Sequence, residues 1–402
     1  MTIVPLAASR SAASRSAASR TAASPMAAED AVLLYAQAPR TQLQIGALCF
    51  FEAAPLRDRR GALRIEELRD HVAARLDRLP RFRQRMAPGL GDPPAPIWVA
   101  DRDFDIGRHC RVVELPEGSG PAGLRRFMDD LLADPMDLDH PLWDITTVTG
   151  IDGWTPDARR AGEGDGEPVD AVAVVVRAHH VMADGIALHA AATLLLEAAP
   201  QPHRPPSDPR VPAWAPAPAP GPVGLTARAL AERTRRQVAL AADVAGVALC
   251  PRRLGTAIRS AANTAGSARH LTSALAPAMD LTGPTGRRRA FAWGSVPMAD
   301  VVAVKAACGA TVNDVVLAIA AGALRRHQEA TRTFDPHGRS PKALIPIGDP
   351  GSVDDPTSNR FSVTSVDLPV TVDDPLERVR LLHDRMHGGT APSVRAIMPY
   401  VF

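Results

Sequence analysis

The stretch Ala171-Val-Ala-Val-Val-Val-Arg-Ala-His-His-Val-Met-Ala-Asp-Gly185 decides how this chain folds. Its first six residues are small or β-branched and apolar on both faces, which is the pattern of a central strand with both faces covered. Residues 186–198, which follow the glycine, are good helix formers. The stretch therefore predicts a central strand, a polar turn and a helix.

Two histidines, His179 and His180, lie where this strand is expected to end. Imidazole is the side chain whose ordinary pKa lets it accept a proton near neutral pH. Adjacent strand residues point to opposite faces, so both rings cannot face one cavity while the strand continues. Asp184 could fix the turn by pairing with a nearby arginine or could orient an imidazole, and Gly185 would supply backbone freedom. On spacing alone, a satisfied polar cluster without a catalytic role is the favoured interpretation.

Metal binding is a third interpretation of this segment. A metal site needs three or four ligands, and none of the other histidines sits in a comparable cluster. The four cysteines also lie far apart, without metal-ligand spacing, which indicates reduced thiols in a cytosolic protein. We therefore expect no metal; the cysteines are Cys49, Cys110, Cys250 and Cys308.

The bulk composition excludes several classes of protein. A chain of 402 residues exceeds what one hydrophobic core usually serves, so two domains are expected. Apolar residues make up 46% of the chain and charged residues 22%, which is ordinary for a globular protein. The net charge of +2 gives no reason to expect a nucleic-acid partner. No stretch reaches about 18 uninterrupted apolar residues, so no membrane-spanning helix is expected.

The chain divides at two segments of unusual composition. Residues 1–24 repeat the unit R-S-A-A-S and carry no acid, which imitates a transit peptide but favours a disordered tail or an over-extended start. Residues 201–222 are so rich in proline that they predict a stiff extended linker. The predicted units are a tail (1–24), an N-terminal domain (25–200), the linker (201–222), a helical segment (223–280) and a C-terminal domain (281–402).

Hydrophobic periodicity predicts the other main elements. Alternation of apolar residues indicates a strand over 43–49, and steps of three and four indicate a helix over 65–79 that Pro80 ends. A basic, Ala-rich helical stretch is expected from Leu225 to Leu275. Further helices are expected over 124–132, 312–327 and 376–386, and a further strand over 361–368.

Several segments together resemble the bacterial wax ester synthase/diacylglycerol acyltransferase family, within the wider coenzyme-A-dependent acyltransferase superfamily. H-H-x-x-x-D-G after a buried strand is similar to the active-site motif of that family, and other matches occur in the expected order. They are Pro25–Asp30, Leu43–Leu48 with Gln44 where a histidine is common, Pro80–Arg85, Pro135–Trp143, Ala310–Ala318 and Ala321–Arg325. The resemblance covers residues 25–402.

The resemblance implies an α/β (α+β) fold of two chloramphenicol acetyltransferase-like domains. Each would be a mixed sheet flanked by helices, and the proline-rich linker would join them. Members of the family continue beyond the point that corresponds to Phe402, so the C-terminal domain here is expected to be incomplete.

The resemblance also assigns roles to residues. His180 is the general base, His179 is its neighbour beside the substrate channel, and Asp184 is mainly structural, with Gly185 permitting the turn. Asn313 and Asp314 belong to the counterpart helix of the second domain near the interdomain channel. Both also fit a simple helix start, because Asn and Asp favour that position. The segment Pro141–Trp143 fits packing better than chemistry.

The implied activity is transfer of a long-chain acyl group from acyl-CoA, as substrate, to diacylglycerol or a long-chain alcohol. No cofactor is expected, and the residues that bind the substrates are not identified. One alternative is a related enzyme that uses another acceptor or a carrier-bound acyl group. Another is an inactive, truncated acyl-CoA-binding protein. The expected location is the cytoplasm, and the basic stretch at 225–275 also suits a membrane or lipid-droplet surface, or an ordinary packed helix.

Overall fold

We describe the protein from a computed structural model. The described residues are 23–26, 28–36, 43–87, 96–151, 170–183, 185–196, 221, scattered positions between 223 and 238, 286–294, 296–348 and 361–387.

The N-terminal half is built on a four-stranded mixed sheet with the order β2-β7-β6-β5. Strand β7 runs antiparallel to both of its neighbours, β2 and β6, whereas β5 and β6 are parallel. All nine residues of β7 are buried, which confirms the predicted central strand. The strands are β2 (Gln44–Glu52), β5 (Cys110–Glu114), β6 (Trp143–Thr149) and β7 (Ala171–His179).

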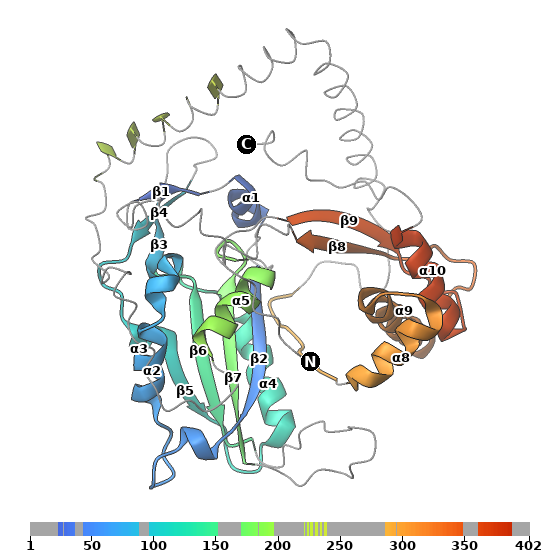
Figure 1. Cartoon of the computed structure of the whole chain (residues 1–402), viewed down its shortest axis with the longest axis horizontal. Coiled ribbons are helices and arrows are strands. Elements are labelled where there is room, and N and C mark those ends of the chain that lie inside the picture. Colours follow the sequence, from blue (N-terminus) through green and yellow to red (C-terminus); the bar gives the residue numbers. More distant parts are fainter. Residues whose placement is uncertain are drawn as a thin grey trace.

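Helices cover both faces of this sheet, because the side chains of β7 are apolar on both. Ala173 and Val175 pack with helix α4 (Gly120–Ala133) on one face. Val174 and Val176 belong to the cluster on the other face, where α2 (Ile65–Ala73) and α5 (Gly185–Leu195) pack. Figure 1 shows α4 on one side of the sheet and α2 with α3 (Ile106–His109) on the other. The buried strand therefore requires the layered arrangement that surrounds it.

A second, small sheet lies beside the first, with the order β1-β4-β3. Its strands are β1 (Ser24–Pro25), β3 (Gln84–Ala87) and β4 (Ile97–Ala100), and α1 (Ala28–Ala36) follows β1. Ser24 lies opposite Trp98, and Met26 is buried in the main core. Structure therefore begins earlier than the sequence predicted, since this antiparallel pairing holds residues assigned to the tail.

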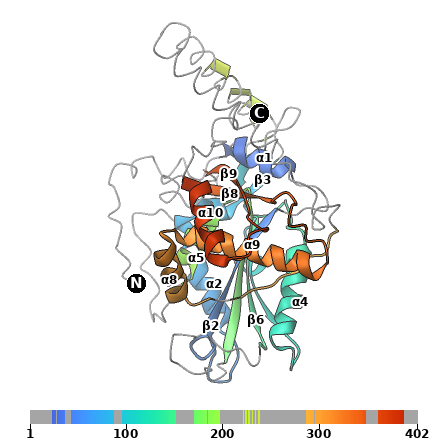
Figure 2. The ribbon, with the colours of Figure 1, turned by 90° about the vertical axis from the view of Figure 1, so that its right-hand side faces the viewer.

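The C-terminal elements form a cluster with its own core. Helices α8 (Met298–Cys308), α9 (Val312–Ala330) and α10 (Pro375–His387) pack with the antiparallel pair β8 (Lys342–Gly348) and β9 (Phe361–Asp367). Figure 2, seen from this side of the molecule, shows the three helices in front of the N-terminal sheet. Among the described residues no single helix is long and apolar enough to cross a membrane; only α8 and α9 together, bent by 100°, reach that length and composition.

The segment before α8 is anchored on the N-terminal half. The Trp293 ring lies 6.3 Å from that of Phe50 on β2, and the Arg125 guanidinium of α4 lies over it. The backbone N–H of Phe291 donates a hydrogen bond to Asp129 of α4. These contacts tie the start of the C-terminal part to the face of the sheet that α4 covers.

Most of the predicted elements are confirmed, with shifts at their ends. The helix predicted over 65–79 is wrong beyond Ala73, because the chain tightens there into 3-10 turns at Leu76–Arg78 and Pro80–Arg83. The strand predicted over 43–49 continues to Glu52 along the full length of β7. The predicted linker at 201–222 falls outside the described residues except for Gly221, and so does most of the stretch from Leu225 to Leu275.

Candidate active site

His179 is the last residue of β7 and is buried, with 1% of its surface exposed. Its backbone N–H donates to the carbonyl of Leu142 at 2.9 Å. Its ring Nδ1 accepts a hydrogen bond from the N–H of Val181 at 3.2 Å, which requires a neutral imidazole with its proton on Nε2. Burial, assisted by the neighbouring His180, lowers the pKa of His179 to about 4. His179 is thus a buried neutral group, and its predicted place beside the substrate channel stays a prediction.

His180 is the first residue of the turn after β7 and is half-buried. Its backbone N–H donates to the carbonyl of Leu43, just before β2, at 2.8 Å. Because the strand ends at His179, the alternation of faces no longer governs the direction of His180. Figure 1 shows this turn and α5 at the end of the sheet nearest to α1. Of the two histidines, His180 is the one with surface available to a substrate.

The remaining residues of the motif are only partly described. Asp184 lies outside the described residues, so its structural role stays a prediction. Gly185 is the first residue of α5, its φ is not positive, and a Cβ at this position would meet nothing within 4 Å. The predicted reason for a glycine, backbone freedom in the turn, is therefore wrong at this residue.

Two charged residues support the end of β7 and were missed by sequence reasoning. Arg177 and Asp144 lie opposite each other on β7 and β6, and both are buried. Arg177 Nη2 donates to Asp144 Oδ2 at 2.5 Å, and its Nε lies 3.2 Å from Oδ1 and 3.1 Å from Oδ2. A charge inside a central strand is a signal that could have revealed the pair, since such a charge needs a partner.

The same arginine also caps helix α4. Arg177 Nη1 donates to the carbonyl oxygens of Leu131 at 2.5 Å and Asp134 at 3.0 Å, and to Gln44 Oε1 at 3.1 Å. Gln44, which lies opposite His179 on β2, in turn donates from Nε2 to the carbonyl of Asp134 at 2.7 Å. A cation at the carboxyl end of a helix is favourable because it meets unpaired carbonyls and the negative end of the helix dipole. Hydrogen bonds through Arg177 and Gln44 thus connect the end of β7, and the turn that begins at His180, to α4 as well as to β2.

The Pro141–Trp143 segment has the packing role that was expected. Trp143 is 1% exposed, its ring stacks on His109 at 4.5 Å, and its Nε1 donates to the carbonyl of Phe82 at 2.7 Å. Leu142 is fully buried. Neither side chain is available to a substrate.

Asn313 and Asp314 lie in the first turn of α9. Thr311 is the N-cap: its N–H donates to Asp314 Oδ2 at 2.8 Å, and its Oγ1 accepts from the N–H of Asp314 at 3.2 Å. This reciprocal capping box confirms the helix-start interpretation for Asp314. Asn313 is exposed. The side chain of Asp314 also bonds to His383 of α10, so its hydrogen bonds remain within the C-terminal elements.

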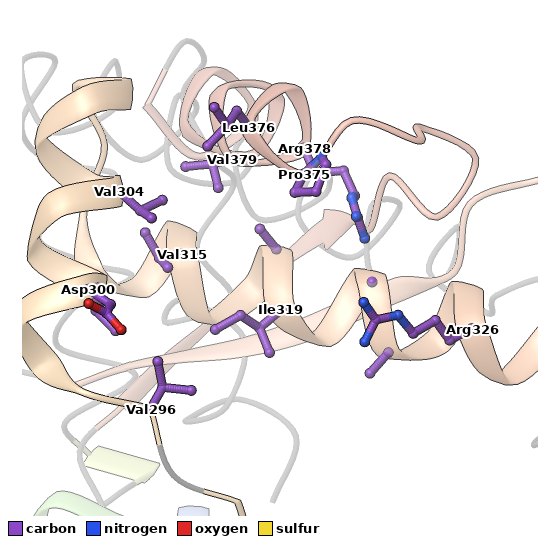
Figure 3. A pocket seen from close by; sticks show the side chains of 14 residues that line it. Val296, Asp300, Val304, Val315, Ile319, Arg326, Pro375, Leu376, Arg378 and Val379 are labelled. Atoms are coloured by element: carbon purple, nitrogen blue, oxygen red, sulfur yellow. The ribbon is translucent and has the colours of Figure 1, made fainter. Parts of the chain in front are cut away.

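Two of the pockets among the described residues have neither His179 nor His180 in their lining. The larger, of about 360 Å³, is an apolar groove between α8, α9 and α10. Figure 3 shows Arg326 and Arg378 close together at one end of this groove and Asp300 near the other. In the smaller pocket, Arg287 and Arg288 share the wall with acidic residues of the α4 end, which does not favour phosphate binding by these arginines.

The chain is similar in sequence to one protein family and to several of its members. A family model for the wax ester synthase/diacylglycerol acyltransferase catalytic domain matches residues 26–160 and 163–316. A predicted diacylglycerol O-acyltransferase of Mycobacterium tuberculosis is 28% identical over 88% of this chain, and another from that species is 30% identical over 88%. The chain spans 64% of the length of the first relative and 68% of the second.

Two solved structures show the fold. The wax ester synthase/diacylglycerol acyltransferase from Marinobacter aquaeolei VT8 is 21% identical, with a TM-score of 0.55 over 91% of this chain and 72% of its own. The first condensation domain of the calcium-dependent antibiotic synthetase is 16% identical, with a TM-score of 0.50 over 91% of this chain and 74% of its own. These likenesses confirm the predicted two-domain fold of sheets and helices. The mixed sheet predicted for each domain is present in the N-terminal half, whereas the described strands of the C-terminal part form one antiparallel pair.

Proposed function

Because the chain belongs to the wax ester synthase/diacylglycerol acyltransferase family, we propose that it is an O-acyltransferase. It transfers a long-chain acyl group from acyl-CoA to diacylglycerol or to a long-chain alcohol. The observation that carries the proposal is His180, a half-buried imidazole held by its backbone at the end of a buried central strand.

His180 acts as the general base in this proposal. A thioester is already activated, whereas an alcohol at neutral pH is a poor nucleophile, so the reaction chiefly needs a base at the hydroxyl. The imidazole takes the hydroxyl proton while the oxygen attacks the carbonyl carbon, the carbon–sulfur bond then breaks, and the proton passes to the leaving CoA sulfur. A positioned base contributes typically about 10²- to 10⁴-fold to the rate. Binding both substrates beside the same ring adds the advantage of proximity.

His179 and Arg177 are positioning residues in this proposal. His179 is a poor base at neutral pH, because burial lowers its pKa to about 4 and its acceptor nitrogen, Nδ1, is bonded to the N–H of Val181. That hydrogen bond fixes the backbone of the turn one residue beyond His180. Arg177 fixes the strand before it through Asp144 and the end of α4. The base is thus held from both sides.

We further propose that the enzyme works in the cytoplasm and meets its lipid substrates at a membrane or lipid-droplet surface. Described residues in the helical stretch that starts at 223 support this: Leu230 and Val238 are each 63% exposed. Arg228 and Arg233 lie close to them in the sequence. Exposed apolar residues interleaved with cations suit an interface with anionic lipid.

The likeness to a condensation domain supports a second candidate function, an acyltransferase that uses a carrier-bound donor or another acceptor. The relatives of the M. tuberculosis group favour the first candidate, since they are predicted diacylglycerol O-acyltransferases. A third candidate, an acyl-CoA-binding protein without turnover, has the same fold. The three differ in what they do with acyl-CoA and a free lipid alcohol.

The test is an assay of the purified chain with palmitoyl-CoA and either diolein or hexadecanol, following both thiol release and the lipid product. We expect product from the wild type and a loss of about 10²- to 10⁴-fold in His180→Ala. His189→Ala is the matched control, because this histidine is exposed on α5 and should leave the rate unchanged. Undiminished product formation by His180→Ala would refute the assignment of His180 as the general base. A wild type that binds palmitoyl-CoA but forms no product would refute the assignment of acyltransferase activity.

A further inference from the structure

Three side chains with metal-binding chemistry meet where the start of α9 lies against the end of α10. They are Asp314, His383 and His387, and one potential ligand atom of each lies within 4.8 Å of those of the other two. The histidines are four residues apart on one helix, so they share a face. Their rings are stacked, with centroids 4.4 Å apart and planes at 29°. The site thus combines a neighbouring histidine pair with a carboxylate from a second helix.

The hydrogen bonds of the two histidines determine which ring nitrogen is available. His383 Nδ1 lies 2.9 Å from Asp314 Oδ2, and His387 Nδ1 lies 3.0 Å from the carbonyl oxygen of His383. An ionised carboxylate and a carbonyl only accept, so without a metal each Nδ1 carries a hydrogen, and the neutral His387 ring keeps its lone pair on Nε2. His387 is held as metal-binding histidines usually are, with its other ring nitrogen bonded to a backbone carbonyl. An ion shared by His383 and Asp314 would take the place of the hydrogen between Nδ1 and Oδ2.

The carboxylate is buried and incompletely satisfied. Asp314 has no exposed surface, and its Oδ1 has no hydrogen-bond partner among the described residues. Burial tends to raise the pKa of Asp314, but hydrogen bonds from His383 and Thr311 and the nearby His387 outweigh it and lower the pKa. The group is therefore an anion with one oxygen unused, which is costly inside a protein unless a cation or donor is nearby.

We propose that Asp314, His383 and His387 bind a divalent transition-metal ion, with Zn²⁺ as the preferred ion, which fastens α10 to the start of α9. Nitrogen and carboxylate oxygen are ligands that Zn²⁺ takes, and three protein ligands leave a fourth position for water. His387 is exposed and gives the ion a route from solvent. The site goes beyond the proposed acyl transfer and does not depend on it.

The sequence alone did not indicate this site. The two histidines are four residues apart, but Asp314 is 69 residues before His383, and a pair without a third ligand predicts no metal. Only the packing of α10 on α9 supplies the third group. We therefore propose a metal site where the sequence alone led us to expect none.

The test is a Zn²⁺ titration of the whole chain, freed of metal with a chelator, in competition with a chromophoric chelator. We expect one saturable site, weakened about tenfold or more in His387→Ala. This variant keeps the Asp314–His383 bond and the capping box, so the fold should persist. His337→Ala, which removes an exposed histidine from the loop after α9, is the matched control and should bind as the wild type does.

A replacement ligand separates metal binding from a purely structural role of the histidine. His387→Cys should restore Zn²⁺ binding and, loaded with Co²⁺, should add a thiolate charge-transfer band that the wild type lacks. At the same Zn²⁺ concentration, the Tm of the wild type and of His337→Ala should rise more than that of His387→Ala. Uptake of Zn²⁺ by His387→Ala equal to that of the wild type, or no saturable uptake by the wild type, would overturn the site.

Discussion

Arg177 and Asp144 face each other across β7 and β6 as a buried ion pair, with Arg177 Nη2 2.5 Å from Asp144 Oδ2. The side chains of both residues are at least nine-tenths buried, at 4% and 9% exposure. The guanidinium has further partners at the end of α4, so every side of it is engaged. Arg177 lies two residues before His179, so the pair joins β7, the strand that ends at His179, to β6 and to the end of α4.

We predict that Asp144→Asn destabilises the chain by about 3–5 kcal/mol, because it leaves a buried guanidinium without its counter-charge. The double variant Asp144→Leu/Arg177→Met should recover part of that loss, since neither charge then remains buried, although the carbonyls at the end of α4 lose their donor. Urea unfolding followed by circular dichroism measures both. Asp170→Asn is the control: its partner Arg57 is 3.3 Å away at the surface, and such a pair is worth about 0–1 kcal/mol. Equal costs for the two single variants would contradict the prediction.

The sequence predicted the central strand, and the position of the two histidines at its end, because a short run of apolar β-branched residues is typical of a strand that is buried on both faces. It did not predict the ion pair beneath them. Arg177 follows the apolar run 171–176, Asp144 follows the segment Pro141–Trp143, and nothing in their spacing joins them. Partners across a sheet depend on register, and register is set by residues far apart in the chain.

A second prediction concerns the pH dependence of stability. The pKa of His179 falls from an ordinary 6.5 to about 4 because the ring is buried and lies beside His180. Between pH 6.5 and 4 this histidine is protonated in the unfolded chain but neutral in the folded chain. The free energy of unfolding is therefore highest above this range and falls as the pH drops through it. The loss by pH 4 amounts to roughly 3 kcal/mol from this group.

His179→Asn isolates the contribution of this ring. Its side-chain oxygen can accept the N–H of Val181 in place of Nδ1, but it does not titrate. We expect the wild type to lose more stability than the variant between pH 6.5 and 4, in urea unfolding measured at a series of pH values. Identical slopes in this range would show that His179 titrates in the folded chain as it does in the unfolded one.

A third prediction follows from the capping box at the start of α9. Thr311→Ala removes the acceptor for the N–H of Asp314 and should cost about 1 kcal/mol of unfolding free energy. Thr311→Ser keeps a hydroxyl and should cost much less. Thr193→Ala, at an exposed position of α5 where the hydroxyl only bonds back to its own helix, is the control. A cost of Thr311→Ala no larger than that of Thr193→Ala would mean that the cap contributes nothing.

Helix ends show where sequence reasoning succeeds and where it stops. Thr311 and Asp314 carry a local capping pattern, so the start of α9 at Val312 could be predicted to the residue. The end of α2 carries no such signal: apolar residues continue at helical spacing past Ala73, and the chain leaves the helix only because Leu76 and Leu79 fill the core from 3-10 turns. Local chemistry is visible in a sequence, whereas the fit of a turn into a core is not.

The last prediction concerns the three described cysteines, which are all free thiols. Burial raises the pKa of Cys110 to about 12, against the opposing effect of the Arg69 cation. Burial also raises the pKa of Cys49. Since the thiolate is the reactive form, iodoacetamide at pH 8 should label Cys308, which is partly exposed, well before Cys110.

A time course of peptide mass spectra measures this order. In urea above the unfolding midpoint the rates should become similar, because burial is then lost. Labelling of Cys110 in the folded chain as fast as that of Cys308 would mean that the edge formed by β5 opens readily. The parallel pairing of Cys110 with Ile145 on β6, and the two bonds from Arg69 to the Cys110 carbonyl at 3.1 and 3.0 Å, oppose such opening. Slow labelling of Cys110 therefore reports that this edge of the sheet stays closed.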